Sequence, residues 1–464
     1  MRLRLAAIWL VLFAVYAGTL GLDAFGSSDY GGDEPHYLLT AKSLVDDRDL
    51  DVRNQRAARD WEDFYPQFLD RHGKLTDGRA HEPHGAGFPA LIAPAFALGG
   101  ATAVELFLAA IAALGGVLAY LLALRVVPDP WAIGATLAVT LSPPFLAYGS
   151  AVYPELAAAT ALAGAALLAL RLQERITRTA AAGCFLLLGT LPWLGTKFVP
   201  AGIVIGVFAA RTLWRTRNRT LALLTAELAF FSVIFYVTLN EALYDGPTPY
   251  SADVEGQTAT DASFPGGYLE RAYRLVALLI DREVGLLRWA PVFVLVGVGV
   301  WMLVRTRSER LTRALPDHAR TEAAALLCAL ALGAQFAVAA FLAPTMFGFS
   351  FPPRHLLAGL TLAVPLVAWG MRRAPRTGAA LALVGIAASA WLYADVRWGG
   401  GGLVLDRPDA PWGPLEDVFP LFEDGNDVAF GVAGALAAVL AGLCVLAWRN
   451  SRQSAGATRA KYSG

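Results

Sequence analysis

The chain has 464 residues, of which 56% are hydrophobic, and its mean hydropathy is +0.49. This composition argues against an ordinary soluble domain and is typical of a protein that crosses a membrane many times. The 38 basic residues balance the 38 acidic ones, and this zero net charge argues against nucleic acid binding. Cys184, Cys328 and Cys444 lie within apolar stretches and indicate neither a disulfide framework nor a metal site.

Apolar runs long enough to cross a bilayer of roughly 30 Å as helix recur along the whole chain. We expect twelve spans, at residues 5–22, 101–124, 131–148, 151–170, 180–195, 198–213, 220–239, 286–304, 322–342, 355–371, 377–394 and 428–448. The run 88–98 is short and rich in proline, so we interpret it as an interfacial or re-entrant helix, with a broken span as the alternative. The first run also resembles a signal peptide, but no A-x-A cleavage site precedes Asp29, so an uncleaved anchor is preferred.

The distribution of charge predicts the orientation of these spans. With a cytoplasmic N-terminus, 22 of the 38 Lys and Arg residues face the cytoplasm, but only five of the 38 acidic residues do. The positive-inside rule therefore favours an integral protein of the plasma or inner membrane with both termini in the cytoplasm. We expect one all-α membrane domain over residues 1–448, with outer loops at 23–87, 240–285 and 396–427, and a disordered cytoplasmic tail over 449–464.

The most informative motif follows the first span, in DYGGDEPHYLLTAK at residues 29–42. It contains the adjacent carboxylates Asp33 and Glu34, followed by His36, Tyr37 and Lys42 in a predicted short helix. Charge beside a bilayer is costly, so such residues are usually functional. Two neighbouring carboxylates can divide the work of a general base and of a metal or substrate ligand. We therefore predict that the acidic pair is catalytic and that the three residues after it contact substrate.

Charged residues also gather at the outer ends of later spans. They are Glu155 in SAVYPEL, Lys197 in GTKF, Asp281 and Arg282 in DREVGLLRW, and Arg354 and His355 in PPRHLL. If these ends converge, carboxylates lie beside Lys and Arg in a cavity next to lipid. Such a cavity suits a substrate with a phosphate head and an apolar tail, because Arg and Lys bind phosphate oxygens. A carboxylate there can accept the proton of an attacking hydroxyl.

An acidic pair directly after the first span, in GGDEPHYLL, resembles the GT-C glycosyltransferases, most closely their protein O-mannosyltransferase and aminoarabinose-transferase branch. The resemblance extends to the layout, with an inside N-terminus, a catalytic first outer loop and a similar number of spans. It implies an enzyme that moves a sugar from a polyprenyl-phosphate carrier to an acceptor at the outer membrane face. The WWDYG-type motif of oligosaccharyltransferases is absent from the sequence, so that branch is set aside.

The resemblance also implies roles for individual residues. Asp33 corresponds to the catalytic aspartate of the first outer loop, and Glu155 matches a second acidic residue by position. Lys197 and Arg354 are the candidates that bind the phosphate of the donor. The expected reaction is an inverting single displacement, with Asp33 as the base. A divalent cation bridging Asp33 and the phosphate is possible, but the sequence does not demand one, and no metal ligands are predicted. The large C-terminal soluble domain of bigger members is not expected here, which leaves open whether the acceptor is a lipid, a glycan or a protein.

Each candidate residue also has a purely structural explanation. The acidic pair can cap the helix that follows, and Glu155 can interact with a helix dipole. Lys197 and Arg354 can extend to lipid headgroups, and residues 281–283 can form a local ion-pair cluster. His81, Glu82 and His84 are close in sequence, but their spacing is not a known metal-ligand signature.

Two other functional classes remain open. Twelve spans also describe a transporter of solutes or of lipid-linked sugars. A transporter would concentrate polar residues near mid-membrane on broken helices, whereas here the charges collect at the outer ends of spans. The second alternative is a non-catalytic membrane scaffold or a degenerate member of the GT-C group.

Overall fold

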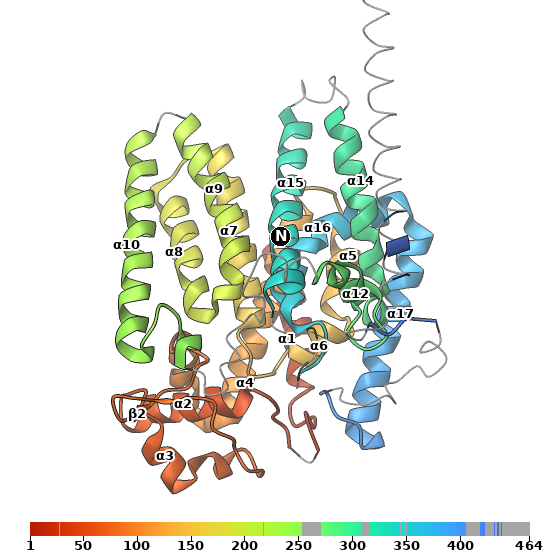
Figure 1. Ribbon diagram of the computed structural model, residues 1–464. Coiled ribbons are helices and arrows are strands. Elements are labelled where there is room, and N and C mark those ends of the chain that lie inside the picture. Colours follow the sequence, from red (N-terminus) through yellow and green to blue (C-terminus); the bar gives the residue numbers. More distant parts are fainter. Residues whose placement is uncertain are drawn as a thin grey trace, which may run out of the picture.

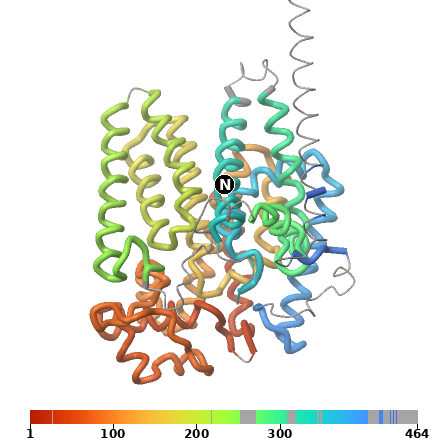
Figure 2. The backbone as a smooth tube through the Cα atoms, in the orientation of Figure 1, coloured from red at the N-terminus to blue at the C-terminus, as the bar shows by residue number. Residues whose placement is uncertain are grey.

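The computed structural model shows an all-α protein with a layer of short elements across one end of the helices (Figure 1). It describes residues 1–26, 28–216, 218–252, 271–308, 316–343, 350–404 and 418–422, with isolated positions at 346, 348, 431, 434, 435 and 438. In the tube view, α7 to α10 form one group and α14 and α15 lie in another (Figure 2). The expected outer loops are therefore described in part, whereas the span expected at 428–448 and the tail at 449–464 lie outside the residues that are described, apart from four single positions in the span.

The main bundle is made of α1 (Arg2–Ala17), α4 (Gly87–Ala123), α5 (Trp131–Thr140), α6 (Pro143–Tyr148), α7 (Glu155–Glu174), α8 (Arg178–Leu194), α9 (Val199–Arg215), α10 (Arg219–Tyr244), α14 (Leu295–Ser308), α15 (Pro316–Ala337), α16 (Leu357–Arg373) and α17 (Pro375–Ala394). In Figure 1, α7 to α10, α14 and α15 lie roughly along one direction. Two short helices, α12 (Arg274–Ile280) and α13 (Leu286–Trp289), precede α14. The 3₁₀ and π turns are η1 (Asp60–Asp63), η2 (Thr196–Phe198), η3 (Pro249–Ala252), η4 (Arg271–Tyr273), η5 (Pro291–Val294), η7 (Val338–Leu342), η8 (Arg354–Leu356) and η9 (Asp395–Gly399).

Helices α7 and α16 lie at the centre of the bundle, and α10 lies at its edge. The most apolar window of α16 is 83% buried and that of α7 is 78% buried, against 17% for α10. The sequence of α7 is rich in Ala, and such small side chains let helices approach closely in a membrane. This helix packs against α4, α8, α9 and α16. It therefore connects elements that are far apart in the sequence.

The layer across one end of the bundle is built from residues that follow α1. We call it the outer layer, because it comes from the first expected outer loop. It contains α2 (Glu34–Asp46), α3 (Arg53–Ala58), η1, and the antiparallel strands β1 (Leu75–Thr76) and β2 (Arg79–Ala80). Asp77 and Gly78 between the strands have φ of 49° and 75°, which matches the tight hairpin turn that Asp-Gly favours. A small apolar core holds the layer together, made of Leu39, Val52, Trp61, Leu69 and Ala80.

The expected number of twelve spans is not confirmed. Among the residues described, seven helices are long and apolar enough to cross a membrane, and α5 and α8 are shorter apolar helices. Prolines explain part of the difference. The stretch expected at 131–148 is divided before Pro143 into α5 and α6, and the stretch at 286–304 is divided by Pro291 into α13, η5 and α14. A proline disfavours the helical conformation of the residue before it, so an apolar run in the sequence does not guarantee one continuous helix.

The short run at 88–98 belongs to the first part of the long helix α4. Gly99 and Gly100 interrupt that helix, with φ of −170° and 63°, and the second part contains the span expected at 101–124. Gly100 adopts a left-handed φ that glycine tolerates without strain. The structure thus places 88–98 in a helical segment joined to the next through a glycine break.

Ion pairs mark the end of the bundle that was predicted to face the cytoplasm. Arg4 pairs with Asp129, Arg125 pairs with Glu174, and Arg307 Nε lies 3.0 Å from Glu322 Oε1. Glu174 ends α7, whose 20 residues rise roughly 30 Å from its other end at Glu155. These six residues were all expected on one side of the membrane, which agrees with their pairing. Which side of the membrane they face stays a prediction.

Candidate active site

The acidic pair of the first loop begins helix α2, and its two carboxylates have different surroundings. Gly32 precedes the pair with φ of 57°, and Pro35 follows it in the first helical turn. Glu34 is 3% exposed, and its two oxygens accept hydrogen bonds from Gly31 N at 2.9 Å and Val152 N at 2.7 Å. Glu34 therefore ties the start of α2 to the loop that leads into α7.

Asp33 occupies the N-cap position but makes no side-chain cap hydrogen bond. Its Oδ2 instead lies 2.7 Å from Nη2 of Arg354. The capping explanation for this carboxylate is therefore wrong, because its oxygens are directed to a cation on another element.

Arg354 links two carboxylates that are 122 residues apart in the sequence. Its Nε donates to Oε1 of Glu155 at 2.7 Å while its Nη2 contacts Asp33. The guanidinium also lies over the ring of Tyr153, with 4.2 Å from Cζ to the ring centroid. The hydroxyl of Tyr153 donates to Gly31 O at 2.8 Å, which joins this ring to the loop before α2.

Lys197 completes a group that we call the charge cluster: Asp33, Glu155, Lys197 and Arg354. Its Nζ lies 2.6 Å from the same Glu155 Oε1 that accepts from Arg354. Glu155 is 0% exposed, and its Oε2 has no hydrogen-bond partner among the residues described. A buried carboxylate oxygen without a partner is costly, so this atom is available to a donor on a ligand.

Helix geometry explains why these four side chains meet. Asp33 lies at the N-cap position of α2 and Glu155 begins α7, while Lys197 and Arg354 lie in the 3₁₀ turns η2 and η8 that lead into α9 and α16. The N-terminal ends of four helices therefore converge. Helix N-termini carry unpaired N–H groups and partial positive charge, so their convergence favours a bound anion.

The two carboxyls of the acidic pair also differ in charge state. Burial alone would raise the pKa of Asp33, but the guanidinium of Arg354 outweighs it and holds that pKa well below its ordinary value. Burial raises the pKa of Glu34 to about 8, against the opposing hydrogen bonds from Gly31 and Val152. Asp33 is thus held as an anion, whereas burial favours the neutral form of Glu34. Pairs whose environments push their pKa values apart are a common feature of acid–base sites.

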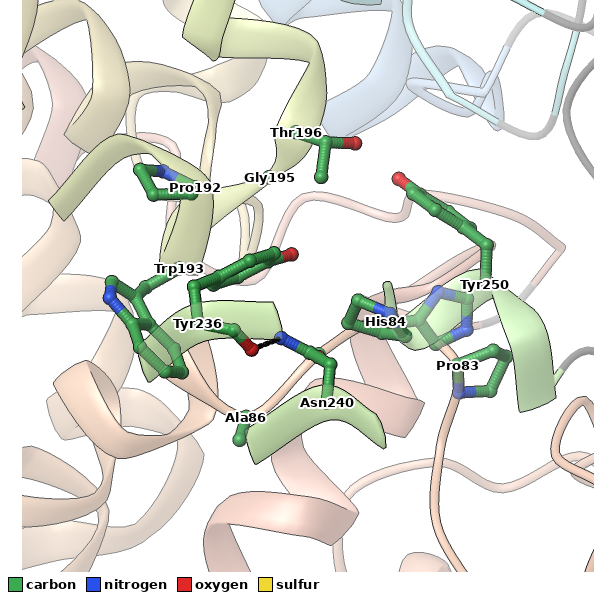
Figure 3. A pocket seen from close by; sticks show the side chains of 12 residues that line it. Pro83, His84, Ala86, Pro192, Trp193, Gly195, Thr196, Tyr236, Asn240 and Tyr250 are labelled. Atoms are coloured by element: carbon green, nitrogen blue, oxygen red, sulfur yellow. Dashed lines mark hydrogen bonds between the residues drawn. The ribbon is translucent and has the colours of Figure 1, made fainter. Parts of the chain in front are cut away.

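Figure 3 shows the side chains that line an open cleft, none of which belongs to the charge cluster itself. The empty volume of the cleft is about 300 Å³, and its walls include Thr196 beside Lys197, together with His84, Trp193, Tyr236 and Tyr250. Trp193 packs edge-on against Tyr236 with 5.0 Å between ring centroids. The aromatic wall belongs to α8 and α10, and α10 carries the exposed side chains of Phe230, Phe231 and Phe235. The cleft therefore lies beside a helix that exposes many apolar side chains.

The other residues predicted for the site lie around this cluster or apart from it. His36 Nδ1 is 3.0 Å from Glu82 Oε2, and Tyr37 packs edge-on against Phe88. His355 follows Arg354 in η8, and its carbonyl accepts from Gln335 Nε2 at 2.8 Å. The Lys42 ammonium pairs with Asp46 at 3.2 Å and Asp63 at 3.5 Å, on the outer layer.

Asp281 and Arg282 belong to a different part of the fold. Oδ1 of Asp281 accepts from the backbone N–H groups of Glu283 and Val284, and Oδ2 accepts from Phe422 N at 2.9 Å. Arg282 N donates to Pro420 O at 2.9 Å. These contacts order the turn between α12 and α13 against residues 418–422. The substrate-binding role expected for this pair stays a prediction.

Sequence reasoning did not select several residues that surround the cleft. Tyr250 and Trp193 line it, and His72 lies near His84 with 3.1 Å between Nδ1 and Nε2. Trp193 lies two residues before the GTKF segment that drew attention to Lys197, so proximity in sequence was an available signal. His72 lies in a loop without a motif, and only the fold brings it to the site.

Comparisons with known proteins give a match at the level of fold. No protein-family model matches the chain, and no curated protein matches its sequence. The structure of ArnT from Cupriavidus metallidurans in the apo state matches with a TM-score of 0.51 at 17% identity, over 84% of this chain and 65% of that one. The chain shares the GT-C fold. This confirms the fold resemblance predicted from the first-loop motif.

Two further structures match less closely. ArnT bound to undecaprenyl phosphate has a TM-score of 0.48 at 14% identity, over 84% of this chain and 63% of that one. The oligosaccharyltransferase of Archaeoglobus fulgidus in the apo form has a TM-score of 0.42 at 14% identity, over 86% of this chain and 56% of that one. This chain therefore spans less than two thirds of the length of each of these proteins. The neighbours are membrane glycosyltransferases.

Proposed function

We propose that this protein is a membrane glycosyltransferase that moves a sugar from a polyprenyl-phosphate carrier to an acceptor hydroxyl. The observation that carries the proposal is Arg354, which joins Asp33 to Glu155 at the converging helix ends. The charge cluster lies where four helices begin rather than in the middle of a helix. This position favours chemistry at the interface over the transporter alternative.

The donor phosphate is expected to bind Arg354 and Lys197. A guanidinium offers a planar fork of donors and an ammonium offers a mobile positive charge, and both bind phosphate oxygens. The apolar wall of α8 and α10 gives the polyprenyl chain a route from the lipid to the cleft. ArnT, whose apo structure has the matching fold, has also been crystallised with undecaprenyl phosphate, which supports a carrier of this class.

The base in this mechanism is Asp33, and donor binding prepares it. Arg354 makes Asp33 a weak base, because it lowers the pKa of this carboxyl. A donor phosphate that takes over the guanidinium weakens that ion pair, so the basicity of Asp33 rises only when donor is present. Glu155 Oε2, which has no partner among the residues described, can accept a hydrogen bond from a hydroxyl of the substrate.

The reaction balances without a further reactant. The acceptor O–H transfers its proton to Asp33 as its oxygen bonds to the anomeric carbon of the sugar. The bond between that carbon and the phosphate oxygen breaks, and the polyprenyl phosphate leaves with the electron pair. Attack from the face opposite the phosphate inverts the configuration. Positioning and electrostatic stabilisation supply most of the rate, because the leaving phosphate needs little protonation.

The test is binding of undecaprenyl phosphate to the purified full-length protein. Arg354→Ala should weaken binding by roughly 10- to 100-fold, since a hydrogen bond to a charged group contributes about 1.5–3 kcal/mol. Arg354→Lys should restore binding only in part, because lysine lacks the planar fork. Arg53→Ala is the matched control, as Arg53 pairs with Asp51 on the exposed outer layer. Unchanged binding in Arg354→Ala would place the phosphate site elsewhere.

We also propose that the charge cluster faces the outside of the cell. The excess of Arg and Lys at the opposite end of the bundle supports this orientation. A reporter fused within residues 305–320 should then read cytoplasmic, and one fused within 245–261 should read external. The reverse result at either position would invalidate the orientation.

A further inference from the structure

Three histidines from separate segments meet in the outer layer, and we call them the histidine cluster: His36, His72 and His84. His36 lies in α2, His72 in the loop before β1, and His84 in the loop before α4. One ring nitrogen from each lies within 4.8 Å of the others. Imidazole nitrogens are preferred ligands of zinc and related transition metals.

His36 is already oriented as a metal ligand. Its side chain is 2% exposed, and its Nδ1 lies 3.0 Å from Oε2 of Glu82, which is itself buried. Arg56 holds the other oxygen of Glu82, with 2.6 Å between Nη2 and Oε1. Although Arg56 Nη2 also lies 3.3 Å from His36 Nδ1, a proton on Nδ1 can be donated to this carboxylate, and the Nε2 lone pair can then bind a metal. Carboxylate–histidine–metal arrangements of this kind are the usual way in which proteins orient a zinc-binding imidazole.

His72 and His84 present a second pair of nitrogens at a suitable separation. Nδ1 of His72 lies 3.1 Å from Nε2 of His84. Two nitrogens bound to one tetrahedral zinc at about 2.0–2.1 Å lie roughly 3.3 Å apart. The ring of His72 stacks on that of His36, with 3.9 Å between centroids. Metal binding therefore requires the His72 ring to tilt from this stack, and its loop position allows such a rotation.

We propose that His36, His72 and His84 bind one divalent transition-metal ion of the zinc class, with Glu82 as the group that orients His36. The proton between His72 Nδ1 and His84 Nε2 moves to the other nitrogen of its own ring when both of these nitrogens bind the metal. Three imidazole ligands leave one tetrahedral position open for water or substrate. His84 lines the cleft beside Tyr250, so the ion lies at the wall of the proposed donor site (Figure 3).

His81 shows that the site depends on the fold rather than on sequence spacing. It is close to His84 in the sequence, but its Nδ1 lies 2.7 Å from Leu243 O in α10 and its ring packs against Tyr244. It therefore does not belong to the histidine cluster. This residue supplies a matched control, because it is a histidine of the same segment with a different contact.

The experiment measures zinc binding to the full-length protein purified without a histidine tag. We expect one zinc ion per chain by elemental analysis, and a Co²⁺-substituted protein with the visible absorption of a tetrahedral site. His72→Ala should abolish the Co²⁺ spectrum and weaken zinc binding by more than the roughly 10- to 100-fold that loss of an orienting group costs. Glu82→Gln should weaken zinc binding by a factor within that 10- to 100-fold range. His81→Ala should bind zinc as tightly as wild type.

Two results would overturn the proposal. One is a wild-type protein with no stoichiometric zinc and no tetrahedral Co²⁺ spectrum after titration. The other is an equal loss of binding in His72→Ala and His81→Ala. Folding of each variant is checked by its elution from size-exclusion chromatography. Because the measurement needs neither donor nor turnover, its result is independent of the transferase proposal.

Discussion

The charge cluster and the histidine cluster differ in which parts of the chain supply their residues. The charge cluster takes its residues from the start of α2, α7, η2 and η8, and its members are up to 321 positions apart. The histidine cluster comes from one stretch, residues 36–84, stabilised by the small core around Trp61. The first therefore depends on how the bundle packs, and the second on how one loop folds over it.

This difference has a thermodynamic consequence. In the charge cluster, buried opposite charges neutralise one another, so the loss of one member leaves another charge buried without a partner. In the histidine cluster, the ring of His72 stacks on that of His36, and His72 and His84 are only partly buried. We therefore expect substitutions to damage folding in the first region and mainly ligand binding in the second.

The largest expected effect is on turnover in Asp33→Asn. Asparagine keeps the size of the side chain but removes its basicity, and a general base contributes roughly 100- to 10,000-fold in rate. Consumption of labelled polyprenyl-phosphate sugar, prepared from host membranes, measures the loss. Asp63→Asn is the control, because Asp63 is 71% exposed on the outer layer. Near-normal turnover by a folded Asp33→Asn protein would remove this residue from the mechanism.

The next largest effect is on stability in Glu155→Gln. Removing this buried charge leaves Arg354 and Lys197 with one carboxylate between them, and breaking a buried pair costs about 3–5 kcal/mol. Chemical unfolding in detergent measures the change in free energy of unfolding. Glu174→Gln, at the other end of α7, should cost at most about 1 kcal/mol, because its pair with Arg125 is partly exposed. Equal costs at the two ends would contradict the account of the charge cluster.

The smallest expected effect is the stabilisation of the protein by zinc, and it distinguishes the histidine cluster from the charge cluster. Zinc at 100 times its dissociation constant should stabilise wild type by about 2.7 kcal/mol, and a chelator should reverse this. In His72→Ala, zinc should give no such increase, although the variant without metal should unfold close to wild type. In Glu155→Gln, the zinc-dependent increase should remain. If zinc still increased the free energy of unfolding of His72→Ala, the metal would have to bind outside the histidine cluster.

Much of the charge cluster was predictable from sequence, because each member lies at the outer end of an expected span. Apolar runs locate helix ends, and the charge asymmetry assigns those ends to one side. The pairing itself was not predictable, since it depends on how α7 and α16 pack. The same limit explains Lys42 and Asp281, which lie in the expected loops but contact Asp63 and the Phe422 amide instead of the charge cluster.

The number of spans was less predictable than the site. Hydropathy reports how apolar a segment is but not whether its helix is continuous. Pro143 and Pro291 divide two of the expected spans, and Gly99–Gly100 interrupts α4. His72 was missed for a related reason, because a single histidine in a polar loop has no periodicity or motif to mark it.

The most direct test of the central claim is an experimental structure of the wild-type protein with undecaprenyl phosphate bound. The account predicts that the phosphate lies between the Arg354 guanidinium and the Lys197 ammonium. It also predicts that the contact between Arg354 Nη2 and Asp33 Oδ2, now 2.7 Å, is opened by the phosphate. A phosphate bound elsewhere, with the Asp33–Arg354–Glu155 bridge intact, would contradict the proposed donor site and the role of Asp33 with it.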